Sequence, residues 1–292
     1  MIETLRPPQN TRREIVQLTS GGTELALHIW RPERIKGAVF YFHGLQSHAG
    51  WLWEVGPRFA DNDIALFVLD RRGSGISAGP RHEIPDADTI LDDYANAVAF
   101  VRGMIGDSVP LSLFGHCLGG SFMAALMHHE SFTTRYDAAV FCSSWLGRLH
   151  ATLGADELRA LAGETGDAPW DAGLRSADFT DEAKYQHFID HDDLAVRQLT
   201  RRSRSVLLEL ERRYLAPRRA LAPVTATFVS GMTDPIVDLE AAHGVFQDLM
   251  SERGAIIKFP TDRHYLFYTD VSDSLVDWTS TYTLLQGLNR GF

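Results

Sequence analysis

The sequence predicts an α/β fold, in which helices cover both faces of a mostly parallel central sheet. Short continuous apolar runs, typical of strands buried on both faces, recur along most of the chain. Segments with the apolar spacing of amphipathic helices separate these runs. Strands that alternate with helices of this length form βαβ units, so we expect them to run parallel. The 292 residues are enough for one large domain with an insertion.

Apolar runs and helical spacing place the predicted elements along the chain. Strands are predicted at residues 15–19, 24–30, 37–42, 64–69, 138–142, 225–230 and 255–259. Helices are predicted at residues 51–60, 86–104, 239–249 and 272–288. The first two strands flank Ser20-Gly21-Gly22-Thr23, which is the pattern of a β-hairpin.

Residues 109–130 organise the rest of the chain, because they combine an apolar strand, a glycine-rich turn and a helix. The segment Gly115-His116-Cys117-Leu118-Gly119 has the spacing of the G-x-S-x-G nucleophile elbow, with cysteine in place of serine. An elbow holds its central residue at positive φ, and its glycines let the helix and the strand approach closely. The N-terminus of the following helix favours a thiolate at Cys117. We therefore predict a reactive Cys117; the alternative is a small buried residue of the core, as we expect for Cys142.

Residues 145–219 interrupt the alternation with charge-rich, helix-like sequence that shows no clear strand. The alternation resumes at residue 225. The sequence therefore predicts an α/β core formed by residues 1–144 and 220–292, with a helical cap, or lid, at residues 145–219. An insertion at this point emerges on the side of the sheet that carries the elbow, so the cap is expected to pack over Cys117 and form an acyl pocket.

Composition and charge exclude several classes of function. The formal net charge of -10 would repel nucleic acids and anionic membranes. No run approaches the roughly 18 apolar residues of a membrane span. The N-terminus is polar and lacks the apolar core of a secretory signal, and two cysteines are too few for a disulfide framework. We expect a soluble, cytoplasmic protein with no nucleic-acid partner.

An elbow nucleophile needs a base and an orienting acid on loops at the carboxyl ends of the strands. The strand at 225–230 runs into a turn that holds Asp234, and the strand at 255–259 runs into a loop that holds His264. The chain order is Cys117, Asp234, His264, which differs from that of chymotrypsin and of subtilisin. We predict that His264 takes the Cys117 proton or pairs with the thiolate, and that Asp234 orients the imidazole.

These motifs resemble the α/β-hydrolase superfamily, and within it the monoacylglycerol lipase-like hydrolases, also called serine aminopeptidase-type hydrolases. The segments that carry the resemblance lie at residues 43–50, 70–79, 115–120, 230–237 and 262–264. The resemblance covers nearly the whole chain and matches the cap weakly. It implies an α/β-hydrolase fold and an oxyanion hole formed by the backbone N–H groups of Leu45 and Leu118.

Other residues are weaker candidates for chemistry. His187 and His191 lie four apart on a predicted helix, but the glutamate of the H-E-x-x-H zinc motif is absent, so we predict no metal site. His116 is an alternative base, although its place in the elbow aims it away from the thiol. Asp70 and Asp238 are alternative acids, better explained as a loop brace and a helix-start residue. Four tryptophans either line an acyl pocket or belong to the core: Trp51, Trp53, Trp145 and Trp170.

The cysteine at the elbow departs from the serine that most members of the resembled family carry. Attack by Cys117 on an oxygen ester would yield a higher-energy thioester, whereas attack on a CoA or carrier-protein thioester is close to isoenergetic. A thioester donor is therefore favoured. Polyhydroxyalkanoate synthases have a similar G-x-C-x-G-G elbow, but this chain lacks a counterpart to their extra N-terminal region. Dienelactone-type hydrolases use an elbow cysteine and finish with water, and a serine replaced by cysteine to trap substrate would give the same pattern.

The predicted function is acyl transfer through an acyl-Cys117 thioester, which accepts the acyl group from a thioester or an ester and passes it to water or to an acceptor nucleophile. The enzyme would then be an acyltransferase, a cyclase or a thioesterase. A simple esterase or monoacylglycerol-type lipase is the alternative. A non-catalytic ligand-binding homologue is the alternative of another class, and it would tolerate loss of His264 or Asp234. We expect a small-molecule, CoA-bound or carrier-bound acyl substrate and no cofactor, and the oligomeric state stays open.

Overall fold

The computed structural model describes residues 11, 13–218, 221, 224–251 and 253–288. The predicted cap boundary at 219–220 and the predicted core residues 1–10 and 289–292 lie outside these residues. Within the described part of the chain, no helix combines the length and the apolar character that a bilayer span requires.

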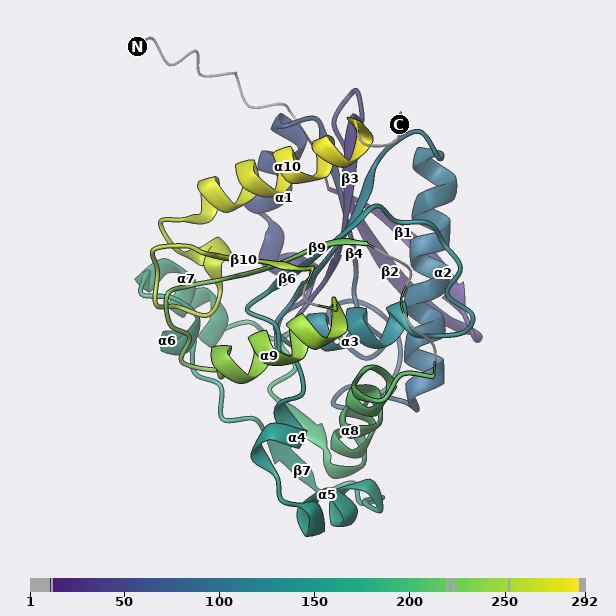
Figure 1. The fold of residues 1–292 in the computed structure, drawn as a ribbon, viewed down its shortest axis with the longest axis vertical. Helices are drawn as coiled ribbons and strands as arrows, with labels where there is room; N and C mark the ends of the chain where they lie inside the picture. The colour runs from purple at the N-terminus through teal and green to yellow at the C-terminus, as the bar shows by residue number, and fades with distance from the viewer. Residues whose placement is uncertain (1–10, 12, 219–220, 222–223, 252, 289–292) are drawn as a thin grey trace.

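The described strands of the core form one eight-stranded sheet in the order β1-β2-β4-β3-β5-β6-β9-β10 (Figure 1). Their bounds are β1 Arg13–Ser20, β2 Thr23–Trp30, β3 Gly37–Phe42, β4 Ile64–Leu69, β5 Leu111–His116, β6 Ala138–Cys142, β9 Thr225–Ser230 and β10 Ala255–Lys258. From β4 to β10 neighbouring strands pair in parallel, and β2 pairs antiparallel with both β1 and β4. The predicted, mainly parallel sheet and the N-terminal hairpin are thereby confirmed.

Helices cover both faces of this sheet (Figure 1). Short helix α1 (Val55–Asp61) and the closing helix α10 (Ser272–Leu288) pack together on one face. Helices α2 (Ala87–Ile105), α3 (Leu118–Met127) and α9 (Leu239–Leu249) lie on the other. The apolar spacing that predicted α2 is its buried face, and the Asp86 carboxylate caps its first turn by accepting the Thr89 N–H. Single-turn helices η1 (Ala49–Leu52) and η2 (Leu266–Tyr268) follow β3 and β10.

The described residues of the insertion, 145–218, are mainly helical, but the prediction that the insertion shows no clear strand is wrong. Their described elements are α4 Arg148–Thr152, α5 Ala155–Ala162, β7 Pro169–Asp171, α6 Ser176–Phe179, α7 Ala183–Asp190, β8 Gln198–Thr200 and α8 Arg201–Leu215. Strands β7 and β8 pair antiparallel, with Trp170 opposite Leu199. Each strand has three residues and neither forms an apolar run, so the sequence carries no strand signal here. The pairing depends on the tertiary contacts of the two segments.

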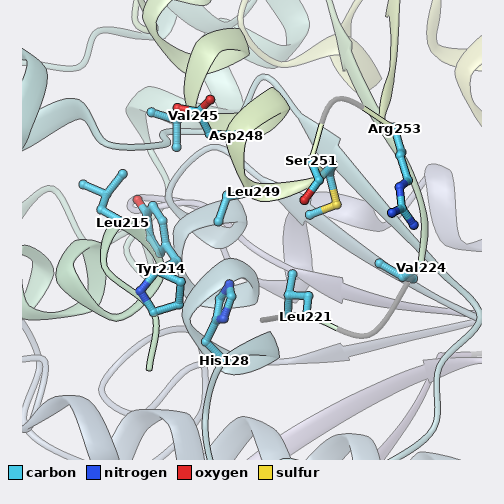
Figure 2. Close-up of a pocket in the computed structure, with 12 residues that line it drawn as sticks. His128, Tyr214, Leu215, Leu221, Val224, Val245, Asp248, Leu249, Ser251 and Arg253 are labelled. Carbon is cyan, nitrogen blue, oxygen red and sulfur yellow. The ribbon is translucent and has the colours of Figure 1, made fainter. Parts of the chain in front are cut away.

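A cavity of 470 Å³ lies between α3, α8 and α9 (Figure 2). His128 lines it at the C-terminal end of α3, with Leu215 from α8 and Val245 and Leu249 from α9. Neither Cys117 nor His264 lines this cavity. It is therefore distinct from the predicted reaction centre at the N-terminal end of α3.

The glycines of the elbow are required by close backbone packing. Cys117 has φ 53° and ψ -126°, the strained conformation expected of an elbow residue. A Cβ atom on Gly119 would lie 2.0 Å from the Phe42 carbonyl oxygen, and one on Gly120 would lie 2.1 Å from Ser144 Oγ. Helix α3 therefore starts pressed against the end of β3, which no larger residue permits.

Gly119→Ala is expected to destabilise the fold by about 1–3 kcal/mol, because the added methyl group must displace the backbone at the end of β3. Urea unfolding followed by circular dichroism measures this. Gly103→Ala is the matched control, since Gly103 lies inside α2 with no atom within 4 Å of the added Cβ. That variant should be stabilised by up to about 1 kcal/mol. Equal effects at both sites would contradict the packing of α3 against β3.

Candidate active site

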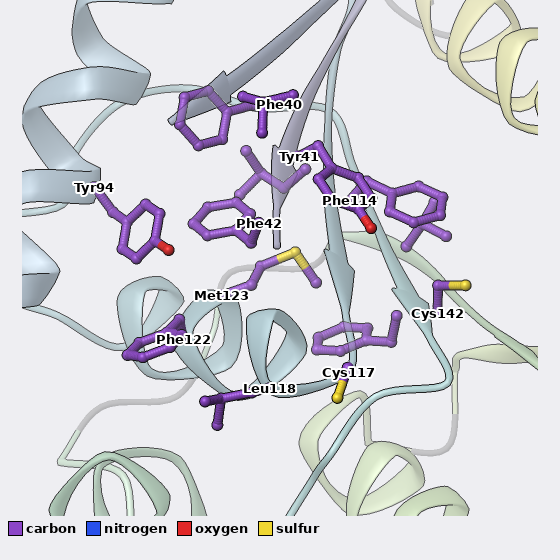
Figure 3. Close-up of a cluster of buried hydrophobic side chains, with 14 of the residues drawn as sticks. Phe40, Tyr41, Phe42, Tyr94, Phe114, Cys117, Leu118, Phe122, Met123 and Cys142 are labelled. Atoms are coloured by element: carbon purple, nitrogen blue, oxygen red, sulfur yellow. The ribbon is translucent and has the colours of Figure 1, made fainter. Parts of the chain in front are cut away.

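An aromatic cluster packs between helix α3, helix α2 and the sheet, next to the elbow (Figure 3). Phe42 from β3 and Phe122 from α3 both pack on Tyr94 of α2. The centroid of the Tyr94 ring lies 4.8 Å from that of Phe42 and 5.7 Å from that of Phe122. Figure 3 shows Cys117 at the edge of this cluster, with its sulfur pointing away from the sheet. Cys142 lies fully buried at the end of β6, which confirms its predicted place in the core.

Asp234 and His264 meet as an ion pair that solvent does not reach. The His264 Nδ1–H donates to Asp234 Oδ2 at 2.8 Å, and neither side chain is exposed. The Asp234 carboxylate also accepts the backbone N–H groups of Ile236 and Val237 at 2.8 and 2.9 Å. Burial opposes ionisation of Asp234, but the charge of His264 and these hydrogen bonds hold the pKa of the carboxyl below its usual value. The carboxylate is therefore fixed in position and in charge.

The second ring nitrogen of His264, Nε2, is available for an interaction with Cys117. Within the described chain, Nε2 is buried and has no hydrogen-bond partner. Burial disfavours the imidazolium, but the interactions of His264 with Asp234 and then with Cys117 outweigh it and raise the pKa of His264 to about 10. His264 therefore pairs with Asp234 and interacts with Cys117, so the three candidate residues lie at one place in the structure.

This pKa makes stability depend on pH. A histidine whose pKa is raised from 6.5 to about 10 on folding stabilises the fold fully below pH 6.5. The stabilisation is lost as the pH rises through about 10, because the folded state then gives up the proton. The unfolding free energy should therefore fall between these values in the wild type and fall less in His264→Gln, as measured by urea unfolding. Identical pH profiles for the two proteins would contradict the raised pKa.

The loop after β3 lies directly on the Cys117 side chain. A Cβ atom on Gly44 would lie 3.1 Å from Cys117 Cβ and 3.5 Å from its Sγ. Leu45, next in the loop, and Leu118, the first residue of α3, are the predicted oxyanion-hole residues. Within the described part of the chain, neither of their N–H groups donates a hydrogen bond to another residue. Two unsatisfied N–H groups beside a candidate nucleophile are what an oxyanion hole requires.

Comparison with known proteins gives the family. Residues 33–270 match the family of hydrolases described as serine aminopeptidase, S33. The chain belongs to this family. A relative, the monoacylglycerol lipase of Mycolicibacterium smegmatis, is 29% identical over 117 residues, which are 40% of this chain and 41% of the lipase. An uncharacterized abhydrolase domain-containing protein of Dictyostelium discoideum is 34% identical over 105 residues, 35% of this chain and 11% of that protein. The chain thus matches less than half the length of these relatives.

A solved structure covers almost the whole of this S33-family chain. The soluble variant of monoglyceride lipase from Saccharomyces cerevisiae, in complex with a substrate analog, has a TM-score of 0.80 and 15% identity over 97% of this chain and 98% of that one. Alpha/beta hydrolase GrgF from Penicillium sp. sh18 has a TM-score of 0.71 and 18% identity over 94% and 99%. These likenesses confirm the predicted α/β-hydrolase fold.

Two alternative acids of this S33-family protein have structural roles. Asp70 accepts the N–H groups of Ala49 and Ile76 and lies 3.1 Å from His28 Nε2, so it braces its own loop. Asp238 caps α9 by accepting the Ala241 N–H. Both roles are the ones that the sequence favours.

The other candidate histidines have contacts that do not involve the thiol. His116 Nε2 lies 3.3 Å from the His264 carbonyl oxygen, and burial followed by the charge of His264 lowers the pKa of His116 to about 3. His116 therefore stays neutral beneath the His264 loop. The rings of His187 and His191 lie 4.1 Å apart, and among the described residues no group of three possible metal ligands includes them.

The four tryptophans separate into different environments. Trp51 is buried and donates its Nε1–H to Asp192 at 2.7 Å, and its ring lies 5.5 Å from that of Phe179. Trp145 is buried, and its backbone N–H donates to the Cys117 carbonyl. Trp53 is 46% exposed, and Trp170 is half-buried beneath a guanidinium. Trp51 and Trp145 are therefore the two that lie near the site.

Residues of the insertion contact the His264 loop directly, and the sequence did not reveal which residues make this contact. The His264 N–H donates to the Asp178 carbonyl, and the next N–H, of Tyr265, donates to the Phe179 carbonyl, each at 3.1 Å. The Phe179 ring lies 5.6 Å from the His264 ring. No sequence pattern marks residues 178–179, because their backbone makes the contact.

A second contact holds the insertion against the loop after β3. Asp192 accepts the Trp51 Nε1–H and lies 3.0 Å from His48 Nε2, and the Val196 N–H donates to the Gln46 carbonyl. Cys117 is 1% exposed and His264 is not exposed at all. Both side chains of the candidate pair are therefore shielded from solvent in this structure.

Asp192→Ala is expected to loosen this contact, because it leaves two buried donors unpaired at a cost of about 1–3 kcal/mol each. Alkylation of Cys117 by iodoacetamide should then be faster than in the wild type, as followed by intact mass. Asp193→Ala is the matched control, since Asp193 is exposed and adjacent. Unchanged alkylation in Asp192→Ala would show that other contacts limit access.

Proposed function

We propose that this S33-family hydrolase is an acyl-transfer enzyme with Cys117 as nucleophile, His264 as base and Asp234 as the orienting acid. One observation carries the proposal: three unusual features occur at the same site. They are the buried His264–Asp234 pair, the positive φ of Cys117, and the backbone N–H groups of Leu45 and Leu118, which have no partner among the described residues. A residue at positive φ and unsatisfied amides each cost stability. A buried His–Asp pair beside a cysteine is the arrangement of a base and its orienting acid. Acyl chemistry accounts for all three together.

The proposed reaction starts from a pair in which the Cys117 proton has already passed to His264 Nε2. The thiolate attacks the acyl carbon, and the N–H groups of Leu45 and Leu118 stabilise the oxyanion, each by about 3 kcal/mol. The carbon–sulfur bond to the donor breaks, and His264 returns its proton to the leaving thiolate. An acceptor then gives its proton to His264, attacks the acyl-Cys117 carbon and releases the thiol.

A thioester donor fits a sulfur nucleophile, because exchange of one thioester for another is close to isoenergetic. The burial of Cys117 also fits transfer to an acceptor. If the site excludes water and holds the acceptor near the acyl carbon, the acceptor reacts before the solvent does. The insertion at 145–219 would act as the cap and supply the acyl pocket. A cytoplasmic location and a substrate carried by CoA or a carrier protein stay predictions.

A simple esterase or monoacylglycerol-type lipase is the second candidate. The family match and the monoacylglycerol lipase of Mycolicibacterium smegmatis favour it. Hydrolysis needs the same three residues and the same oxyanion hole, with water as the acceptor. The two candidates therefore differ in the donor and in the acceptor rather than in the site.

Product partition tests the proposal. Wild type and Cys117→Ser are incubated with one acyl thioester, S-butyryl-N-acetylcysteamine, and a panel of amines and carbon nucleophiles, and free acid is measured against acylated acceptor. The wild type should acylate an acceptor, whereas Cys117→Ser should lose thioester turnover and keep or gain hydrolysis of p-nitrophenyl butyrate. Free acid as the sole product with every acceptor would leave a thioesterase or esterase. No turnover of either donor would favour a non-catalytic binding protein.

A further inference from the structure

Arg71 is a buried cation beside the candidate oxyanion hole. Its side chain lies among apolar residues at 1% exposure, 5.3 Å from the Phe122 ring. Among the described residues no carboxylate forms a salt bridge with it, whereas the next residue, Arg72, pairs with Asp93 through two hydrogen bonds of 2.8 Å. The charge of the buried Asp70 favours the guanidinium but forms no salt bridge with it. A buried guanidinium without a directly paired carboxylate is costly, so its position calls for a function.

Arg71 is hydrogen-bonded to the loop that follows β3, and it also interacts with the Tyr94 hydroxyl of α2. One guanidinium nitrogen, Nη1, donates to the Gly44 carbonyl at 3.2 Å, and Nη2 donates to the Leu45 carbonyl at 3.1 Å. The Arg71 backbone N–H donates to His43 Nε2 at 3.0 Å. Since Nε2 accepts, His43 carries its proton on Nδ1, which donates to the Gly44 carbonyl at 2.9 Å. Burial and the charge of Arg71 lower the pKa of His43 to about 3, which keeps that ring neutral.

These bonds determine where the Leu45 N–H points. The Gly44 carbonyl and the Leu45 N–H belong to one planar trans peptide, so they point in opposite directions. Two donors, from Arg71 and His43, hold the carbonyl on one side. The N–H is therefore held on the other side of the peptide plane, where it has no partner among the described residues.

We propose that Arg71 is a positioning residue of the oxyanion hole. Its guanidinium holds the Gly44 and Leu45 carbonyls so that the Leu45 N–H is presented to the oxyanion, and its charge adds to the positive potential behind the hole. Arg71 acts through the loop and does not touch the substrate. The inference rests on the proposed function, because it assumes that an acyl oxyanion forms at Cys117.

The fork of the guanidinium matters for this task. Two carbonyls 3.1 and 3.2 Å from two different nitrogens are bridged by one planar group. Lysine would supply the charge but only a single nitrogen, and methionine would supply neither. Arg71→Lys should therefore retain part of the effect, and Arg71→Met should lose it.

The test compares two reactions of the same thiol. Acylation by S-butyryl-N-acetylcysteamine develops an oxyanion, whereas alkylation by iodoacetamide displaces iodide from a saturated carbon and develops none there. Both are followed on Cys117 by intact mass. In Arg71→Met the acylation rate should fall by roughly 10- to 100-fold, as expected for loss of part of an oxyanion hole, while alkylation changes by less than about threefold. Arg71→Lys should lie between Arg71→Met and the wild type.

Arg72→Met is the control for damage to the fold, because it removes the ion pair with Asp93 in the same loop. It should lower the melting temperature and leave the ratio of acylation to alkylation unchanged. If the wild type is acylated but Arg71→Met and Arg71→Lys keep its ratio, or lose both reactions in parallel, the role of Arg71 is wrong and the proposed function stands. If the wild type is alkylated but not acylated, the proposed function fails, and the role of Arg71 fails with it.

Discussion

Replacing Cys117 with alanine should lower acyl transfer by about 10⁴-fold or more, the loss typical of an enzyme without its nucleophile. The remaining N–H groups and His264 can still bind the substrate, but no thioester can form on the protein. Initial rates with S-butyryl-N-acetylcysteamine at a fixed acceptor concentration measure the loss.

Cys142→Ala is the control for this variant, because Cys142 is the only other cysteine of the sequence and is fully buried. It should keep its rate within a few-fold and lose about 1–2 kcal/mol of stability from the small cavity. Equal activity of Cys117→Ala and Cys142→Ala would rule out Cys117 as the nucleophile.

Asp234→Asn should lower the rate by at least about a hundredfold while the fold is kept. An asparagine amide has nearly the same shape but no charge, so it neither stabilises the imidazolium nor fixes the tautomer that aims Nε2 at the thiol. The pKa of His264 should fall, because the Asp234 charge is the largest of the effects that raise it. A pH–rate profile and an NMR titration of the imidazole measure both effects.

Asp238→Asn is the matched control, since Asp238 lies four residues further on and caps α9 through one carboxylate oxygen. Asparagine caps helices about as well as aspartate, so this variant should keep its stability and rate. If Asp234→Asn were as active as Asp238→Asn, the acid would have to be another residue.

The strands and the three candidate catalytic residues could be predicted because each is marked locally. An apolar run followed by a glycine or a charged turn indicates where a parallel strand ends, and the carboxyl ends of neighbouring strands meet at one edge. Cys117, Asp234 and His264 each follow such a run. Their meeting therefore follows from the order of the strands in the sheet.

Contacts made by the insertion and by buried polar groups could not be predicted in this way. The pairing of β7 with β8 and the bonds from residues 178–179 to the His264 loop join segments that are far apart in the chain and carry no pattern of their own. Arg71 follows a strand among other charged residues, and a sequence does not show which of two adjacent arginines is buried. Burial of a charge is settled by packing and by the carbonyls that surround it.

Intact mass spectrometry of the wild type after brief incubation with a series of acyl thioesters tests the central claim most directly. The account predicts one added acyl group, located on Cys117 by peptide mapping, that appears before product and disappears when an acceptor is added. The adduct should be absent in Cys117→Ala and slow to form in Asp234→Asn. Turnover of a thioester without any acyl adduct on Cys117, or an adduct on another residue, would contradict it.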